Sequence, residues 1–333
     1  MRAMQSVTDQ LAPIKASVAD FIAAFDTEFA HALASQSRWL GQAIELLNKA
    51  TGKQVRPLLI GLMSKACNHE PSAKTTEAAV LLELIHTATL IHDDVIDNSN
   101  LRRGHPTLNA IFDNRVAVLV GDFVLSSALM RAIELQDLRI ISIISSIGRE
   151  LSEGEIRQFE VADEVVLDEE IYYSVIKQKT ATLFRAAAEL AAISVDAEEG
   201  LISLCGQIGE LLGYAFQIRD DIFDYYQQDI GKPTGNDIRE GKVTLPLLYA
   251  LNTSCAEKTE KEECLSLIKA RSFDHENLDR LTRFAISAGG IEYANKRMRA
   301  FLSQANALID TLPNKEAGLQ LKQLAEFICN RSV

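Results

Sequence analysis

Apolar residues recur every three or four positions along most of the chain, which is the pattern of helices that bury one face. One such series consists of Leu81, Leu84, Ile85 and Ala88, and no proline occurs between Pro106 and Pro233. Short runs of alternating β-branched residues, which would favour strands, are scarce. The pattern therefore predicts an all-α fold of about ten or more helices of ordinary length.

Four segments rich in Gly, Pro, Asn or Asp separate the predicted helices. They span residues 68–72, 98–106, 195–200 and 230–246. The last contains Lys232, Arg239 and Lys242 among its glycines and prolines, so we expect a mobile, basic loop there. No shift in composition and no repeat of fixed period marks a second domain, so the sequence predicts one domain over residues 1–333.

The chain has 333 residues, of which 46 are acidic and 34 are basic, and its formal net charge is −12. This balance argues against binding to nucleic acid, because such binding depends on neutralising phosphates. The longest uncharged stretch, residues 243–256, has 14 residues, whereas a membrane-spanning helix needs about 20. The sequence also has no signal-peptide pattern, and its five cysteines lack CxxC spacing. We therefore expect a soluble cytoplasmic protein with reduced thiols and no membrane anchor.

Two aspartate clusters share the spacing DDxxD. The first consists of Asp93, Asp94 and Asp97, at the end of an apolar helix that we expect to begin near Thr75, and the second of Asp220, Asp221 and Asp224. A single cluster of this kind is more often an exposed acidic helix end. Two copies on apolar helices favour another interpretation, because carboxylates without imidazole or thiolate suit Mg²⁺, which keeps positions open for phosphate oxygens. The pair predicts a site that holds several Mg²⁺ ions around a diphosphate.

Basic residues accompany both clusters. They are Lys53 and Arg56 before the first cluster, Arg102 and Arg103 after it, Lys179 beside Thr180, and Lys232 and Lys242 after the second cluster. Each alone could be an ordinary solvated cation. As a set, these seven cations with about three Mg²⁺ balance six carboxylates and two diphosphates to near neutrality.

With these features the sequence resembles the trans-isoprenyl diphosphate synthases, the head-to-tail prenyltransferases, and among them the long-chain, octaprenyl type. The motifs lie in order from about Lys53 to Leu248, and the resemblance is weaker beyond. They are GKQVRP, HTATLIHDDVID, RRGHPT, LVGDF, QKTATLF, FQIRDDIFD and GKPTGNDIREGKVTLPL. The resemblance implies a single polyprenyl synthetase domain over residues 1–333, folded as a helical bundle around a central cavity.

The resemblance also assigns roles to individual residues. It makes Asp93, Asp97 and Asp220 the principal Mg²⁺ ligands, with Asp94, Asp221 and Asp224 as ligands or supports. The allylic diphosphate would be held by Arg102, Lys179, Thr180, Gln217, Lys232 and Lys242, of which Arg102, Lys179, Lys232 and Lys242 would act in catalysis. Isopentenyl diphosphate would be held by Lys53, Arg56, His86 and Arg103. Without the neighbouring motifs, His86 would read as an ordinary core histidine.

In this family, stabilisation of the departing diphosphate by Mg²⁺ and basic side chains lets the allylic C–O bond ionise. The double bond of isopentenyl diphosphate then attacks the cation, and loss of a proton gives a product five carbons longer. The resemblance further implies a loop over residues 230–246 that closes over the site to exclude water. It also implies a homodimer, for which the apolar segment Val116–Ile133 is a candidate interface.

Product length in this family depends on residues one turn below the first cluster. Short-chain members tend to carry bulky aromatics at the two positions that Ala88 and Thr89 occupy here. Both side chains are small, so we expect the growing chain to pass them and reach about thirty to fifty carbons, with octaprenyl as the best estimate. Phe123 or Met130 could form a deeper floor. A product of this length most often becomes a quinone side chain.

The chain departs from the family pattern in one motif, because Thr51 and Gln54 stand where the family has glycine and arginine. One cation near isopentenyl diphosphate is therefore missing. Two alternatives stay open, a short-chain farnesyl or geranylgeranyl diphosphate synthase and a non-catalytic subunit of a heteromeric synthase. Terpene cyclases and head-to-head synthases fit less well, because they lack the second DDxxD or the RRGHPT and GKPTG strings.

Overall fold

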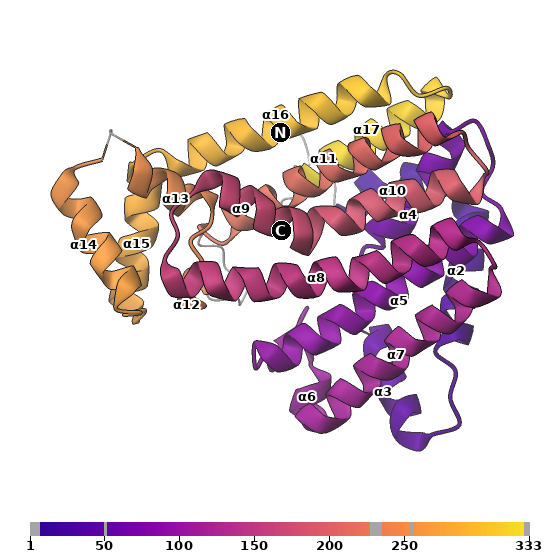
Figure 1. Cartoon of the computed structure of the whole chain (residues 1–333), viewed down its shortest axis with the longest axis horizontal. Coiled ribbons are helices and arrows are strands. Elements are labelled where there is room, and N and C mark those ends of the chain that lie inside the picture. The colour runs from indigo at the N-terminus through magenta and orange to yellow at the C-terminus, as the bar shows by residue number, and fades with distance from the viewer. Residues whose placement is uncertain (1–6, 50–51, 227–234, 254–255, 330–333) are drawn as a thin grey trace. The chain divides into compact units, whose positions relative to one another are not determined.

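The computed structural model describes residues 7–49, 52–226, 235–253 and 256–329, and these residues are mostly helical (Figure 1). The all-α prediction is confirmed: the described part of the chain forms helices α1 to α17, a π-helical segment η1 and a two-stranded hairpin. The chain divides into two compact units. The first comprises Met1–Gly148, Leu183–Gln207 and Ile309–Leu324, and the second Arg149–Thr182, Ile208–Leu308 and Ala325–Val333. A single domain over residues 1–333 stays a prediction.

The first unit is built around helix α5. Its helices are α1 (Val7–Ala16), α2 (Ala19–Ala32), α3 (Arg38–Lys49), α4 (Val55–Ala66), α5 (Ala73–Ile96), α6 (Leu108–Ile111), α7 (Asn114–Glu134) and most of α10 (Thr182–Ser194). The division between the units falls inside α8 (Leu138–Glu164), α11 (Glu199–Phe223) and α17 (Lys315–Cys329). Helix α5 packs against α2, α4 and α7, and α7 runs alongside it (Figure 1).

Helix α5 begins at a capping box and is buried along most of its length. The side chains of Ser72 and Thr75 cap its first turn, close to the start at Thr75 expected from the sequence. The residues from Val80 to Leu82 have no exposed surface, which is typical of a helix that is covered on several sides. The first aspartate cluster therefore lies at the far end of a firmly held helix.

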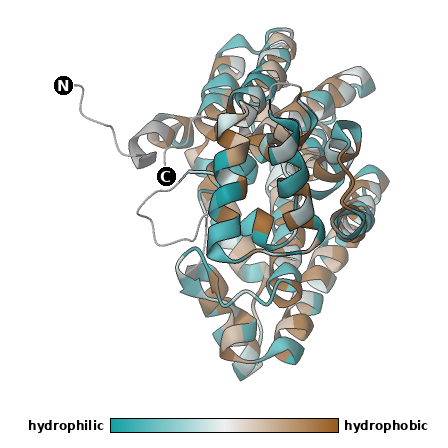
Figure 2. Cartoon of the chain, turned by 90° about the vertical axis from the view of Figure 1, so that its left-hand side faces the viewer, coloured by the Kyte–Doolittle hydropathy of each residue, from teal (hydrophilic) through white to brown (hydrophobic). Residues whose placement is uncertain are grey.

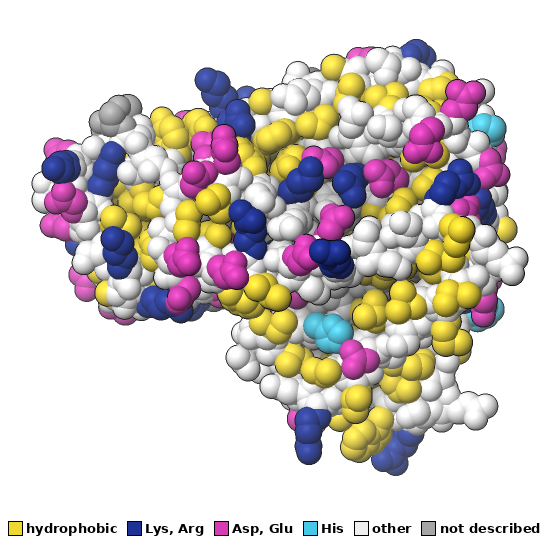
Figure 3. All heavy atoms as spheres, viewed as in Figure 1, with side chains coloured by type: hydrophobic (Ala, Val, Ile, Leu, Met, Phe, Trp, Pro, Cys, Tyr) yellow, Lys and Arg dark blue, Asp and Glu magenta, His cyan; other side chains and the backbone are white. Residues whose placement is uncertain are grey.

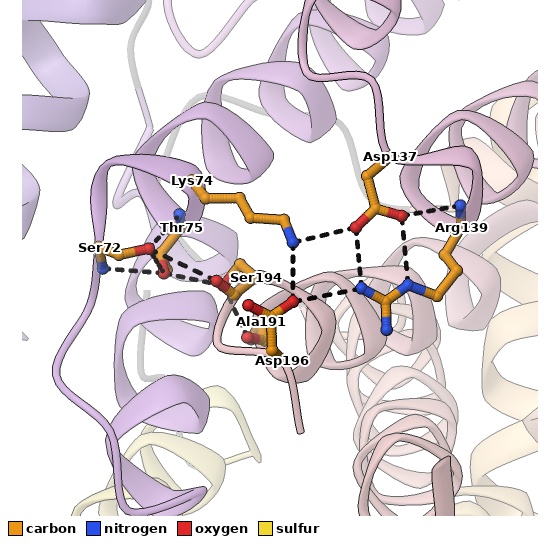
Figure 4. Close-up of polar contacts among 8 residues, drawn as sticks. All are labelled: Ser72, Lys74, Thr75, Asp137, Arg139, Ala191, Ser194 and Asp196. Carbon is orange, nitrogen blue, oxygen red and sulfur yellow. Dashed lines mark hydrogen bonds and ion pairs between the residues drawn. The ribbon is translucent and has the colours of Figure 1, made fainter. Parts of the chain in front are cut away.

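Three turns meet near the start of α5 through a network of ion pairs (Figure 4). Lys74 Nζ lies 3.0 Å from Oδ2 of Asp137 and 3.0 Å from Oδ1 of Asp196. Arg139 Nη2 bridges the same two carboxylates at 2.9 and 3.3 Å. Beneath them, the hydroxyls of Thr75 and Ser194 lie 2.8 Å apart. The network joins α5 to the turns before α8 and after α10.

The break predicted at residues 98–106 contains a hairpin of β1 (Leu101–Arg102) and β2 (His105–Pro106). Its two central residues, Arg103 and Gly104, have φ values of 53° and 78°. Positive φ at both positions gives a turn that matches the twist of the strands. The hairpin holds two arginines, Arg102 in β1 and Arg103 in the turn, directly after the first cluster.

The second unit carries the other aspartate cluster. Its remaining elements are α9 (Glu169–Ile176), η1 (Lys177–Ala181), α12 (Asn236–Arg239), α13 (Leu245–Asn252), α14 (Lys258–Lys269), α15 (His275–Ser287) and α16 (Gly290–Ile309). Figure 2 faces α14 and α15, whose outer surfaces carry many hydrophilic residues, while Leu281 and Phe284 of α15 are buried. The expectation of an irregular loop throughout residues 230–246 is wrong for Asn236–Arg239, which forms α12.

Two helices, α7 and α11, are long and apolar enough to cross a membrane by length and composition alone. This differs from the expectation that no segment could do so, because a few charges per helix do not prevent a high mean hydropathy. A core helix passes the same test, and half of the α11 window is buried in the protein. The α7 window is only 33% buried, so this helix presents an apolar face to the outside.

Candidate active site

The middle aspartate of the first cluster is fixed by an arginine of the hairpin. Nε and Nη2 of Arg102 both lie 2.8 Å from Oδ1 of Asp94, whose residue surface is 7% exposed. Asp93 is half-buried, and Asp97, which ends α5, is exposed. Arg102, expected from the family to hold the allylic diphosphate, therefore contacts the first cluster in this structure.

A cavity of about 400 Å³ opens beside this cluster in the first unit. Its polar lining consists of Asp26, Asn48, Gln54, Glu83, His86, Thr87, Asp94, Arg102 and Arg103. Its apolar wall includes Phe25, Phe29, Leu47, Leu90 and Ile91. The structure thus brings together His86 and Arg103, two of the four residues expected to hold isopentenyl diphosphate. Lys53 is exposed, and neither Lys53 nor Arg56 lines this cavity.

The field around His86 favours an anionic ligand. Burial holds the pKa of His86 well below its usual value, and the charges of Arg56, Arg103 and Arg102 lower this pKa further. A neutral imidazole surrounded by three guanidinium groups suits a group with several negative charges. Among the described residues, none forms a hydrogen bond with Nδ1 of His86, so this buried nitrogen can serve a ligand.

Glu83 is an acidic residue in the same cavity that sequence reasoning missed. Burial raises its pKa, and the charges of Arg56 and Arg103 oppose that rise. Among the described residues, none forms a hydrogen bond with its buried Oε2 atom. Glu83 lies three residues before His86, on the same side of α5, and this spacing was the available signal.

Gln54, which stands where the family has arginine, forms a hydrogen bond with an acidic residue of the cavity. Gln54 has a left-handed φ of 56° before α4, and its Nε2 donates to Oδ1 of Asp26 over 2.6 Å. Next to it, a Cβ at Gly52 would lie 2.6 Å from Nη1 of Arg103. Gly52 therefore allows the close approach of Arg103, while Asp26 places a negative charge at the edge of the cavity.

The middle aspartate of the second cluster is also buried and bonded on both oxygens. Asp221 is 2% exposed; its Oδ2 accepts a 2.6 Å hydrogen bond from Tyr172, and its Oδ1 accepts a 2.8 Å bond from Gln217. Burial raises the pKa of Asp221 to about 6, although both hydrogen bonds favour the charged form. Thr180 in turn donates to Oε1 of Gln217 over 2.6 Å. The structure thus brings Thr180, Gln217 and Asp221 together, as expected.

Asp224 holds the segment that follows the second cluster. Its carboxylate accepts the backbone N–H groups of Asn236 and Asp237, each over 3.0 Å, and its carbonyl accepts from Gly235. Asp224 therefore supports the start of α12, whereas Asp220 is exposed. Asp237 was missed by sequence reasoning; burial, followed by the charges of Asp221 and Asp224, raises its pKa to about 7.

A second cavity, of about 120 Å³, lies in the second unit. Its polar lining includes Gln158, Tyr172, Lys179, Thr180, Gln217, Asp221, Asp237, Lys242 and Thr244. Four residues expected to hold the allylic diphosphate therefore share one cavity. Lys179 Nζ lies 2.6 Å from Oε2 of Glu155, and Lys242 pairs with Glu240. Lys232 lies outside the described residues.

The carboxylates suit a metal that binds together with a diphosphate. Among the described residues, no group of three or more His, Cys, Asp or Glu side chains is arranged to hold a metal ion alone. Mg²⁺ needs only one or two carboxylates when phosphate oxygens and water complete its octahedral shell. Asp93, Asp97 and Asp220 are more exposed than the buried Asp94 and Asp221. Their carboxylates are therefore accessible to a metal ion.

The residues expected to control product length lie on α5, Ala88 in the buried core and Thr89 half-buried beside it. Ala88 is 1% exposed, and the Thr89 hydroxyl donates to the carbonyl of His86 over 2.8 Å. Neither residue lines the two cavities. Met130 is 65% exposed on α7, so the expectation that it forms a deeper floor is wrong for the single chain.

Comparison with known proteins identifies the family. The family model "Polyprenyl synthetase" matches residues 37–284. The octaprenyl diphosphate synthase of Haemophilus influenzae is 35% identical over 305 residues, covering 88% of each chain. Component 2 of the heptaprenyl diphosphate synthase of Geobacillus stearothermophilus is 33% identical, covering 94% of this chain and 97% of its own.

A solved structure gives the same result. The polyprenyl synthase of Caulobacter crescentus CB15, complexed with calcium and isoprenyl diphosphate, matches with a TM-score of 0.90 and 30% identity over the whole of both chains. Fold and sequence together define an all-α enzyme that transfers prenyl groups. The chain belongs to the polyprenyl synthetase family.

Proposed function

We propose that the protein condenses isopentenyl diphosphate repeatedly onto an allylic diphosphate and releases diphosphate at each step, giving a long all-trans polyprenyl diphosphate. One observation carries the proposal: each DDxxD cluster has a buried, hydrogen-bonded middle aspartate beside more exposed ones and next to a cavity with basic residues. Burying a charged carboxylate in the protein costs free energy. A buried and fixed aspartate is therefore not expected at an acidic helix end that has no function.

The proposed roles follow the two cavities. Lys179, Thr180, Gln217 and Lys242, which share the smaller cavity, would hold the allylic diphosphate together with Arg102 and Lys232. His86 and Arg103 would hold isopentenyl diphosphate with Lys53 and Arg56. Asp93, Asp97 and Asp220 would bind about three Mg²⁺ ions with the substrates. Asp94, Asp221 and Asp224 would orient these ligands.

The chemistry needs charge stabilisation more than an acid or a base. When bound, Mg²⁺ supplies positive charge that stabilises the leaving diphosphate. Arg102, Lys179 and Lys242 would hold the same group as the allylic C–O bond breaks, and the neutral His86 would hold the other diphosphate by hydrogen bonds. The double bond of isopentenyl diphosphate forms the new C–C bond, and the released diphosphate takes the proton.

We propose octaprenyl diphosphate as the product, because Ala88 and Thr89 are small where the family's short-chain members have aromatics. The similar octaprenyl synthase of Haemophilus influenzae supports this length, whereas the similar heptaprenyl synthase component supports a slightly shorter one. A short-chain synthase and a non-catalytic subunit of a heteromeric enzyme are the alternatives. We propose that the product is made in the cytoplasm and that it becomes a quinone side chain.

We propose further that the protein is a homodimer joined through α7. The outer face of α7 exposes Leu119, Met130 and Ile133, each by about two thirds, and hydrophobic side chains gather over this helix in Figure 3. Asp122, the acid on this face, lies 3.3 Å from Nε2 of His92. Exposed apolar surface of this kind marks protein contacts more often than free surface.

The test is turnover by the purified chain alone. We expect Mg²⁺, farnesyl diphosphate and labelled isopentenyl diphosphate to give a linear series ending near forty carbons by mass spectrometry, and chelator to abolish it. Asp220→Asn should remove turnover, whereas Asp163→Asn, at an exposed ion pair with Arg271, should not. A series ending at fifteen or twenty carbons would support the short-chain alternative. No metal-dependent product from a folded chain would support the non-catalytic subunit.

A further inference from the structure

A buried tyrosine outside the expected site residues is bonded to the second aspartate cluster. Tyr172 on α9 is 8% exposed, and its hydroxyl donates to Oδ2 of Asp221 over 2.6 Å. A phenol is protonated at neutral pH, so the tyrosine is the donor and the carboxylate the acceptor. One oxygen of the most buried aspartate in the cluster therefore depends on this hydroxyl.

The other oxygen of Asp221 is connected through hydrogen bonds to the segment α9–η1, which also contains Tyr172. Gln217 donates to Oδ1 over 2.8 Å, and its own Oε1 accepts from Thr180 over 2.6 Å. Tyr172 and Thr180 are eight residues apart on the continuous segment α9–η1, and Gln217 and Asp221 are one turn apart on α11. The hydrogen bonds thus form a closed ring that joins α9–η1 to α11 at two points.

The ring encloses an irregular turn. Residues Lys177–Ala181 form the π-helical segment η1, whose wider turn shifts the side chains that follow relative to an ordinary helix. Lys179 lies in this segment and faces the same cavity as Tyr172 and Asp221. Segments of this kind occur often at functional sites.

We propose that Tyr172 is a positioning residue for the prenyl transfer reaction: its hydroxyl locks Asp221, and through the ring it fixes Asp220 and Lys179 for a metal-bound diphosphate. The inference rests on the proposed function. Tyr172 itself need not touch the substrate, because both of its effects pass through Asp221. Removing the hydroxyl leaves Oδ2 buried without its donor, and such a carboxylate turns away from its position.

The test compares two adjacent tyrosines. Tyr172→Phe removes the bond to Asp221, whereas Tyr173→Phe removes a hydroxyl that accepts a 2.8 Å bond from Nε of Arg297, away from the cluster. Binding of Mn²⁺ with inorganic diphosphate is measured by titration calorimetry without turnover, and kcat and KM are measured at several Mg²⁺ concentrations. We expect Tyr172→Phe to weaken metal and diphosphate binding or lower kcat by about 10- to 100-fold, with KM for isopentenyl diphosphate unchanged.

Tyr173→Phe should change neither quantity. Equal metal and diphosphate binding and equal kcat in Tyr172→Phe and the parent protein would overturn the proposal. Tyr172→Phe is also made in an Asp221→Asn background as a control for folding. The amide of Asn carries no charge, so loss of the hydroxyl does not leave a buried charge without its donor. If Tyr172 acts through Asp221, Tyr172→Phe has no further effect on metal binding there; a second full loss would also overturn the proposal. A parent protein without metal-dependent turnover contradicts the proposed function instead.

Discussion

Replacing Asp137 by alanine tests how the ion-pair network near the start of α5 contributes to stability. The Asp137 side chain is 13% exposed and accepts hydrogen bonds from the side chain and the backbone N–H of Arg139, while Lys74 lies 3.0 Å away (Figure 4). The same carboxylate caps the first turn of α8. We expect Asp137→Ala to destabilise the protein without changing the chemistry at either aspartate cluster.

The size of the loss follows from two contributions. Losing an N-cap carboxylate costs about 1 kcal/mol. Losing charge-assisted bonds to Lys74 and Arg139 costs about 1 kcal/mol more, because the carboxylate is shielded but its partners reach solvent. A total near 2 kcal/mol lowers the Tm of a chain of this size by about 4 °C.

Asp113 provides the matched control. It caps the first turn of α7 by accepting from the N–H of Val116, and it pairs with Arg115 two residues later, as Asp137 pairs with Arg139. Arg115 is 91% exposed, and no third charge joins this pair among the contacts of the described residues. Asp113→Ala should therefore lower Tm less than Asp137→Ala, and the difference measures the contribution of Lys74.

The stabilisation by Asp137 should depend on pH in a known direction. Hydrogen bonds from Arg139 hold the pKa of Asp137 well below its usual 3.8, so the stabilisation is present above that value and is lost as pH falls below it. Calorimetric scans of the parent and Asp137→Ala should differ at pH 7 and converge toward pH 2. Equal Tm values for the Asp113 and Asp137 variants at pH 7, or a gap that widens in acid, would show that the ion-pair network does not add to stability.

Three further predictions concern product length, assembly and substrate affinity. Ala88→Phe should shorten the product, because a ring placed at a 1% exposed position on α5 blocks the growing chain; an unchanged product series by mass spectrometry would contradict this. Ile133→Asp should convert the proposed dimer to a monomer in light scattering, whereas a dimer that persists would exclude the α7 face. Gln54→Arg alone should leave KM for isopentenyl diphosphate unchanged, because Asp26 would bind the new guanidinium. Adding Asp26→Asn should then lower KM by about tenfold, and a full effect of the single change would argue against a role for Asp26.

The sequence was sufficient to predict the class of fold and the start of helix α5. The break before α5 and the capping residues Ser72 and Thr75 mark a start that the structure gives at Ala73. Local signals of this kind depend on residues within one turn, so one sequence contains them. The hairpin at Arg103 and helix α12 were not predicted, because short elements in Gly-rich segments are stabilised by contacts such as those from Asp224.

The exposed face of α7 could not be predicted from its pattern. Val120 and Val124 are buried, while Leu119 and Met130 of the same helix are exposed. A helix that is apolar on both sides gives no indication of which side its own chain covers. The same property explains why α7 passes a length and composition test for membrane helices and why it is the surface proposed for a second copy.

The partners of the buried aspartates were also beyond the sequence. Tyr172 and Asp221 are 49 residues apart, and no local rule relates them. The two roles inside DDxxD, however, follow from helix geometry. Successive residues are about 100° apart around a helix, whereas residues four apart differ by only about 40°. Asp93 and Asp97 can therefore face one ligand while Asp94 turns toward the protein, and Asp221 does the same beside Asp220. In both clusters of this chain the protein holds the carboxylate that turns inward, and Arg102 and Tyr172 are the donors.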